Sequence, residues 1–214
     1  MARKGFDTGT TIIALGLVAI IVVAAVVGWR AIQPKNQIVF VGDSITDQAR
    51  PDIESRFAVD ENHLKAVGGK TIQDMSAAAH DLAELAPRKA VINLGTNNAL
   101  LGQPVDKNSQ DLSEVLGYYR DTTCVLVVTI NEHMISPGGL DANGRAVSLN
   151  QQIRQWAAGS PGRKVIDWAQ IVNDYDAAGT PDGALTLDTV HPTPLGQKRL
   201  LDAYEAGIAS CPGD

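Results

Sequence analysis

Five short apolar runs recur along most of the chain, and each is followed by a stretch in which apolar residues have helical spacing. A strand with one exposed face alternates polar and apolar residues, whereas a strand buried on both faces is apolar almost throughout. The runs are of the second kind. They predict strands over residues 37–41, 63–67, 89–94, 124–130 and 164–168.

The stretches between the runs predict helices. Thr71, with Asp74 three residues later, forms a capping pattern at the start of one helix. Thr193 followed by Pro194 marks the start of the last helix, because proline is favoured in a first helical turn. Further helices are predicted over residues 52–57, 111–120 and 145–158, and a loop over residues 132–144.

Alternation of buried strands with helices predicts a parallel sheet covered on both faces, which is a three-layer α/β/α sandwich. We expect the flavodoxin-like strand order 2-1-3-4-5. Right-handed crossovers gather the carboxyl ends of parallel strands along one edge of the sheet. The segments that follow the five strands are therefore expected to face a common crevice.

The N-terminal part of the chain has a different pattern. Residues 8–29 carry no charged side chain, and residues 12–27 show no polar stripe. At 1.5 Å per residue this run is long enough to cross a hydrocarbon core of about 30 Å. It predicts a transmembrane anchor, with a cleaved signal peptide or a buried core helix as the alternatives. The predicted organisation is a flank (1–7), an anchor (8–29), a linker (30–36) and a globular domain (37–214).

Composition excludes several classes of function. The 214 residues carry a formal net charge of −6, and the sequence pI is near 5.1. No cluster of Lys and Arg interleaves with aromatic residues, so we expect no nucleic-acid partner. The four histidines are scattered and no C-x-x-C is present, so we expect no metal site and no cofactor.

Four polar segments follow predicted strands or precede a predicted helix. They are Gly42-Asp43-Ser44, Gly68-Gly69-Lys70-Thr71, Gly95-Thr96-Asn97-Asn98 and Asp188-Thr189-Val190-His191. A serine at a strand end can be a nucleophile if a base, an orienting acid and oxyanion donors accompany it. Each segment taken alone also fits an ordinary turn or helix cap.

Taken in order, the four segments resemble the motifs of the SGNH (GDSL) hydrolase family. Gly42-Asp43-Ser44-Ile45-Thr46 is similar to its first block, Gly69 to its second, Gly95-x-Asn97 to its third and Asp188-x-x-His191 to its fifth. The resemblance extends from about Gln37 to Ile208 and implies the SGNH fold. It departs from the family pattern at Asn98, where Asp is common, and at Ala66-Val67-Gly68, which lacks an upstream Asn.

The resemblance implies a role for each matching residue. Ser44 is the expected nucleophile, His191 the general base and acid, and Asp188 the acid that orients the imidazole. The backbone N–H groups of Ser44 and Gly69 and the side chain of Asn97 are the expected oxyanion hole.

Three further residues have weaker claims on the site. Asn98 and His133 are expected to line the substrate crevice, although a satisfied loop histidine is the simpler interpretation of His133. Asp167 ends the fifth predicted strand and could compete with Asp188, although a capping role suits it better.

The expected activity is that of a membrane-anchored serine esterase. Its substrate would be an acyl ester on an envelope glycan or a lipid, and its intermediate an acyl-serine. One alternative is an O-acyltransferase that uses the same triad on an envelope glycan. A second is an idle binding module tethered to the membrane.

The two cysteines bear on location. Cys124 starts the fourth predicted strand, and Cys211 follows the last helix. An even cysteine count on an exported domain favours a disulfide. We therefore expect a cytoplasmic N-terminus, an extracytoplasmic domain and a Cys124–Cys211 bridge, with two unpaired thiols as the alternative.

Overall fold

The computed structural model describes residues 38–136, 138–179 and 184–212. The description below concerns the unit that residues 36–214 form. The predicted anchor at residues 8–29 lies outside the described residues. Within the described ranges, no helix has the length and apolar character needed to span a bilayer.

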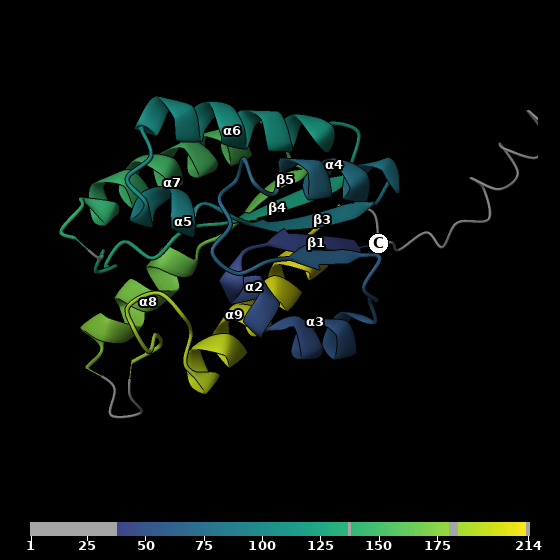
Figure 1. Ribbon diagram of the computed structural model, residues 1–214. Helices are drawn as coiled ribbons and strands as arrows, with labels where there is room; N and C mark the ends of the chain where they lie inside the picture. The colour runs from purple at the N-terminus through teal and green to yellow at the C-terminus, as the bar shows by residue number, and fades with distance from the viewer. Residues whose placement is uncertain (1–37, 137, 180–183, 213–214) are drawn as a thin grey trace, which may run out of the picture. The chain divides into compact units, whose positions relative to one another are not determined.

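Five parallel strands form the central sheet (Figure 1). They are β1 (Ile38–Gly42), β2 (Leu64–Ala66), β3 (Lys89–Asn93), β4 (Cys124–Val128) and β5 (Arg163–Ile166). Their order is β2-β1-β3-β4-β5, and every neighbouring pair is parallel. The predicted strand order is confirmed.

Helices cover both faces of the sheet, as Figure 1 shows. One layer contains α4 (Ser76–Glu84), α5 (Thr96–Leu100), α6 (Val105–Tyr118) and α7 (Ala142–Ala158). The other contains α2 (Ser44–Gln48), α3 (Arg50–Phe57), α8 (Trp168–Ala177) and α9 (Pro194–Ala209). The three-layer α/β/α architecture is therefore confirmed for the described residues.

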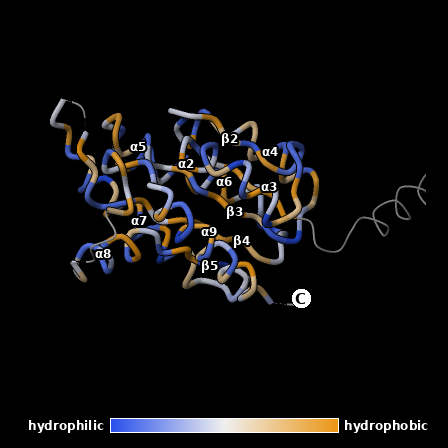
Figure 2. Tube along the Cα trace, turned by 90° about the horizontal axis from the view of Figure 1, so that it is seen from below, coloured by the Kyte–Doolittle hydropathy of each residue, from blue (hydrophilic) through white to orange (hydrophobic). Residues whose placement is uncertain are grey.

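Alternate residues of each central strand enter two separate hydrophobic cores. In β1, Val39 and Val41 join the core under α4, α6 and α7, whereas Phe40 joins the core under α3 and α9. All three side chains are fully buried. Figure 2 shows the hydrophobic colour concentrated along the strands at the centre of the trace. Burial on both faces explains why the strands are apolar without alternation.

Several helix boundaries differ from the sequence prediction. Thr71 and Asp74 exchange two hydrogen bonds, with N···O distances of 3.0 and 3.2 Å, but they close a turn and the helix begins at Ser76. Helix α6 starts at Val105 rather than Asp111. The short helix α5 and the helix α8 were not predicted, and the fifth strand ends at Ile166, two residues early.

The expected disulfide between Cys124 and Cys211 is formed, with a Cα–Cα distance of 5.7 Å. Cys124 is the first residue of β4, and Cys211 follows the end of α9. The bridge therefore fastens the last helix to the amino end of a central strand, away from the edge at which the strands finish.

Candidate active site

Ser44 is the first residue of α2, and one residue separates it from Gly42, where β1 ends. Asp43 between them is fully buried and caps the helix: its Oδ1 accepts a hydrogen bond from the Ile45 N–H at 3.1 Å. The Asp43 N–H donates to the Asn93 carbonyl of β3 at 3.2 Å. The turn that presents Ser44 is therefore bonded to β3 through the Asp43 main chain and to α2 through the Asp43 side chain.

His191 lies between Ser44 and Asp188. Its Nε2 is 2.9 Å from Ser44 Oγ, and its Nδ1 is 2.7 Å from Asp188 Oδ2. A carboxylate accepts only, so Nδ1 carries the proton and Nε2 is free to accept one from the serine. The structure thus brings together the three residues predicted as a triad, from segments 147 residues apart.

Asp188 is held in its ionised form. Partial desolvation raises the pKa of its carboxyl, but hydrogen bonds from the His191 N–H, the His191 ring and the Val190 N–H outweigh this and lower the pKa to about 2. Asp43 has the opposite balance. Complete burial raises its pKa to about 7, although the Ile45 N–H and the Thr96 hydroxyl favour its charged form.

The oxyanion side of the site is formed by two segments. A Cβ added to Gly68 would lie 3.8 Å from Ser44 Cβ, so the 68–69 turn is next to the nucleophile. Asn97 donates from Nδ2 to the Lys70 carbonyl at 2.9 Å, which brings its amide to the same turn. One amide hydrogen of Asn97 is used in this bond, and the second is the one that can serve an oxyanion.

The glycine at position 95 allows Asn97 to reach the turn at residues 68–70. Gly95 caps α5 with φ +118°, a conformation that side-chain-bearing residues rarely adopt. An added Cβ would also lie 2.7 Å from Leu149 and 2.8 Å from Ile130. The sharp turn at Gly95 carries the chain from β3 into α5, with Asn97 in its first turn.

Asn98 does not line the crevice, and the expectation of a substrate contact is wrong at this residue. Its side chain is fully buried. Its Oδ1 accepts from the Ile72 N–H at 2.9 Å, and its Nδ2 donates to Gln103 and Asn108 at 2.9 and 3.0 Å. Asn98 thus fastens the loops on the oxyanion side instead of facing the substrate.

His133 and Asp167 are also accounted for by structural contacts. His133 is exposed and its Nε2 is 2.6 Å from Asn173 Oδ1 of α8, so its expected substrate contact stays a prediction. Asp167 caps α8 and accepts two hydrogen bonds from Arg154, at 3.0 and 2.8 Å. It makes no contact with His191 among the described interactions, as the capping interpretation predicted.

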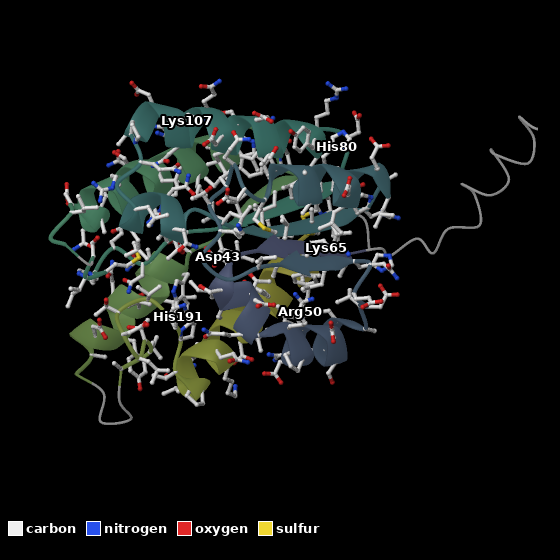
Figure 3. All side chains as sticks on the ribbon, in the orientation of Figure 1. Asp43, Arg50, Lys65, His80, Lys107 and His191 are labelled. Carbon is white, nitrogen blue, oxygen red and sulfur yellow. A yellow bond between two sulfur atoms is a disulfide. The ribbon has the colours of Figure 1, made fainter. Side chains whose placement is uncertain are left out.

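Figure 3 shows Asp43 and His191 near one another at the end of the sheet where β1 finishes, and His80 far from them. Sequence reasoning gave no positioning role to two residues on this side, Asn131 and Thr189, although the Asn131 amide donates to the Thr189 carbonyl. Thr189 occupies an unspecified position of Asp188-x-x-His191, and Asn131 follows the fourth predicted strand without a motif of its own. The positive φ of Thr189, +68°, leaves no trace in the sequence, because threonine is not a residue expected in that conformation.

A comparison with models of protein families finds a match over most of the described domain. The model of the GDSL-like lipase/acylhydrolase family matches residues 40–199. That range contains every residue of the triad and of the expected oxyanion hole. A comparison with curated protein sequences finds no match.

Solved structures share the fold at low identity. A GDSL-like lipase from Bacteroides thetaiotaomicron is 20% identical with a TM-score of 0.65, covering 87% of this chain and 93% of its own. A catalytic mutant of the acetylxylan esterase Axe2 from Geobacillus stearothermophilus is 18% identical with a TM-score of 0.63, covering 81% and 94%. The C-terminal catalytic domain of peptidoglycan O-acetyltransferase A from Streptococcus pneumoniae is 17% identical with a TM-score of 0.62, covering 82% and 93%.

Proposed function

We propose that this chain, which belongs to the GDSL-like lipase/acylhydrolase family, hydrolyses a carboxylic ester through an acyl intermediate on Ser44. The observation that carries the proposal is the hydrogen-bonded series Ser44–His191–Asp188, with distances of 2.9 and 2.7 Å. Nucleophile, base and orienting acid are then within reach of one another in the resting enzyme.

The chemistry follows from these contacts. Ser44 Oγ forms a bond to the ester carbonyl carbon while His191 Nε2 takes the hydroxyl proton. The C–O bond to the alcohol then breaks, and the alcohol leaves with that proton. Water attacks the acyl-serine with His191 again as the base, and the acid is released as Ser44 regains its proton.

The negative charge that develops on the carbonyl oxygen needs donors. We propose as donors the backbone N–H groups of Ser44 and Gly69 and the free amide hydrogen of Asn97, which the closeness of Gly68 to Ser44 and the bond from Asn97 to the Lys70 carbonyl support. Asp188, ionised above a pH of about 2, balances the positive charge that His191 gains during each proton transfer.

Hydrolysis is placed before acyl transfer because the matched family model describes lipases and acylhydrolases, and the exposed triad gives water access to the acyl-serine. The Asp188 side chain is 56% exposed and that of His191 is 28% exposed. Transfer to a sugar hydroxyl remains the second candidate, because the same fold carries the catalytic domain of a peptidoglycan O-acetyltransferase. An idle binding module is disfavoured, because it has no need of the aligned triad.

The substrate class and location belong to the proposal as well. We propose an acyl ester on an envelope glycan or a lipid, as the acetylxylan esterase neighbour acts on an acylated glycan. The Cys124–Cys211 bridge supports an oxidising compartment outside the cytoplasm. The uncharged run at residues 8–29 supports a single membrane anchor with the N-terminus in the cytoplasm.

Ser44→Ala tests the activity. The variant should lose covalent labelling by a fluorophosphonate, and its turnover of p-nitrophenyl acetate should fall to the uncatalysed rate, because no other side chain carries the acyl group. Ser109→Ala is the matched control: within the described ranges, that hydroxyl bonds only to the Val105 carbonyl in α6. Full turnover by Ser44→Ala would refute the esterase and favour the binding module.

Acyl-acceptor assays then separate hydrolysis from transfer. Acetylated xylan or peptidoglycan is offered as the donor, with and without an unacetylated oligosaccharide, and the products are measured by mass spectrometry. Free acetate at an unchanged rate supports hydrolysis. An acetylated oligosaccharide that forms at the expense of acetate supports transfer.

A further inference from the structure

The turn that carries the acid and the base is shaped by its own hydrogen bonds, and Val190 within it packs into the core under α4, α6 and α7. Asp188 Oδ1 accepts from the Val190 and His191 N–H groups at 3.0 and 2.7 Å, and the Leu187 N–H donates to the His191 carbonyl at 2.8 Å. All of these bonds are within the turn. They shape it, but they do not fix its position relative to Ser44, which comes from β1.

The backbone of this turn is strained at Thr189. Its φ is +68°, and a branched Cβ makes this left-handed conformation unfavourable. A residue stays in such a conformation only if its surroundings hold it there. The question is therefore which contacts hold Thr189.

Both holding contacts come from the segment after β4. The Asn131 side chain donates from Nδ2 to the Thr189 carbonyl at 2.7 Å, and the Ile135 N–H donates to Thr189 Oγ1 at 2.8 Å. The two hydrogen bonds thus hold both the main chain and the side chain of Thr189, which lies between Asp188 and His191 in the sequence.

Of the two donor residues, Asn131 is the one fixed to the core, whereas the Ile135 side chain is exposed. Asn131 is 4% exposed, and its Oδ1 accepts from the His133 N–H at 3.0 Å, which aims Nδ2 at Thr189. The fully buried Asn150 of α7 bonds both the N–H and the carbonyl of Ile130, each at 2.7 Å. Hydrogen bonds of 2.7 Å therefore connect α7 to Ile130, just after β4, and the next residue, Asn131, to the strained turn.

We propose that Asn131 and Thr189 are positioning residues: the Asn131 amide and the Ile135 N–H hold Thr189 in its strained conformation and so keep His191 aligned on Ser44. The proposal rests on the esterase activity proposed above. We call these two hydrogen bonds, from the Asn131 amide and the Ile135 N–H to Thr189, the clamp. If the clamp is lost, Thr189 relaxes to negative φ, and Asp188 and His191 move with it. A shift of about 1 Å in a catalytic group can cost about 100-fold in rate.

Asn131→Ala tests the clamp in the full chain with p-nitrophenyl acetate. The turnover number should fall about 10–100-fold, with KM within about twofold, because Asn131 orients the triad and is not expected to touch substrate. Rates are divided by the number of sites that react with a fluorophosphonate, so that misfolded protein does not count.

Glycine at position 189 provides the rescue. Thr189→Gly alone should retain turnover within a few-fold, because glycine adopts φ +68° without strain. In Asn131→Ala/Thr189→Gly, turnover should recover toward that of Thr189→Gly, since the turn no longer resists its own conformation. Such non-additivity is the signature of two residues that act through one element.

Thr129→Val is the matched control. Thr129 is as buried as Asn131 at the same strand end, but its hydroxyl bonds to Asp167 and to the Ala169 N–H of α8. It should lower the melting temperature without changing the turnover number. A drop in turnover equal to that of Asn131→Ala would show that any weakening of this strand end suffices.

The outcomes separate the clamp from the activity. A wild-type protein that neither turns over the ester nor reacts with the fluorophosphonate would refute the proposed function itself. If the wild type is active, unchanged turnover in Asn131→Ala would overturn the clamp. So would a double variant no faster than Asn131→Ala.

Discussion

At the scale of single residues, the most unusual group is the Asp43 carboxyl beside the nucleophile. Because burial raises its pKa to about 7, the folded protein keeps a proton that the unfolded chain releases near pH 4. The folded state binds more protons at this carboxyl between these values, so the contribution of Asp43 to stability is fully present below about pH 4 and is lost as pH rises toward 7.

Asp43→Asn should remove this dependence. Asparagine retains an oxygen that can cap α2 but does not titrate. Urea unfolding at pH 4.5 and 7.5 should show that the wild type loses up to a few kcal/mol more stability between these pH values than the variant does. An equal change in both proteins would mean that Asp43 does not carry the proton.

The choice between two acids is also a residue-scale prediction. Asp188→Asn should leave the fold intact and lower turnover by up to about 10⁴-fold, because the amide no longer selects the imidazole tautomer that accepts from Ser44. Asp167→Asn is the matched control, since Asp167 is engaged by Arg154. The turnover numbers of both variants on p-nitrophenyl acetate test the choice of acid. If Asp188→Asn keeps the wild-type turnover number while Asp167→Asn is inactive, Asp167 is the orienting acid.

At the scale of elements, α5 combines buried polar contacts with the apolar packing of Ala99 and Leu100 against the core. Asn98 connects it to Ile72, Gln103 and Asn108 through three hydrogen bonds of 2.9–3.0 Å. Removal of a buried amide leaves its partners unpaired, at about 1–3 kcal/mol.

Asn98→Ala should therefore lower the free energy of unfolding by about 1–3 kcal/mol while KM for a soluble ester stays within about twofold. Urea denaturation and steady-state kinetics measure the two effects. Asn143→Ala, at an exposed position in the first turn of α7, should change neither. A large rise in KM with unchanged stability would restore the substrate contact that the burial of Asn98 argues against.

The same elements show how far sequence determines this fold. The strands and their order could be predicted because a buried parallel strand has a plain signal, an apolar run bounded by polar turns. The triad could be predicted because each member lies in a short motif. Helices α5 and α8 could not: α5 has five residues, too few for a period, and Trp168 at the start of α8 continues an apolar run. The Asn131–Thr189 contact joins positions 58 apart with no local signal.

At the scale of the whole molecule, the disulfide and the active site lie at opposite ends of the sheet. Cys124 opens β4, whereas Ser44, Asn97 and Asn131 follow the ends of their strands. The bridge closes a long loop, with 87 residues of sequence separation, and fastens α9 to the sheet. In the chain-entropy model, a loop of that size stabilises the folded state by about 4–5 kcal/mol.

Removal of the bridge should therefore cost stability and spare catalysis. Cys124→Ala/Cys211→Ala should lower the melting temperature by about 5–15 °C, from a loss of about 2–5 kcal/mol, while the turnover number at 25 °C stays within about twofold. Dithiothreitol should lower the melting temperature of the wild type toward that of the variant and leave the variant unchanged. Alkylated, fully reduced wild type with an unaltered melting temperature would mean that the bridge does not constrain the unfolded chain. A turnover number that falls in proportion to the reduced fraction would instead couple the two ends of the sheet, which the separation of the bridge from the triad argues against.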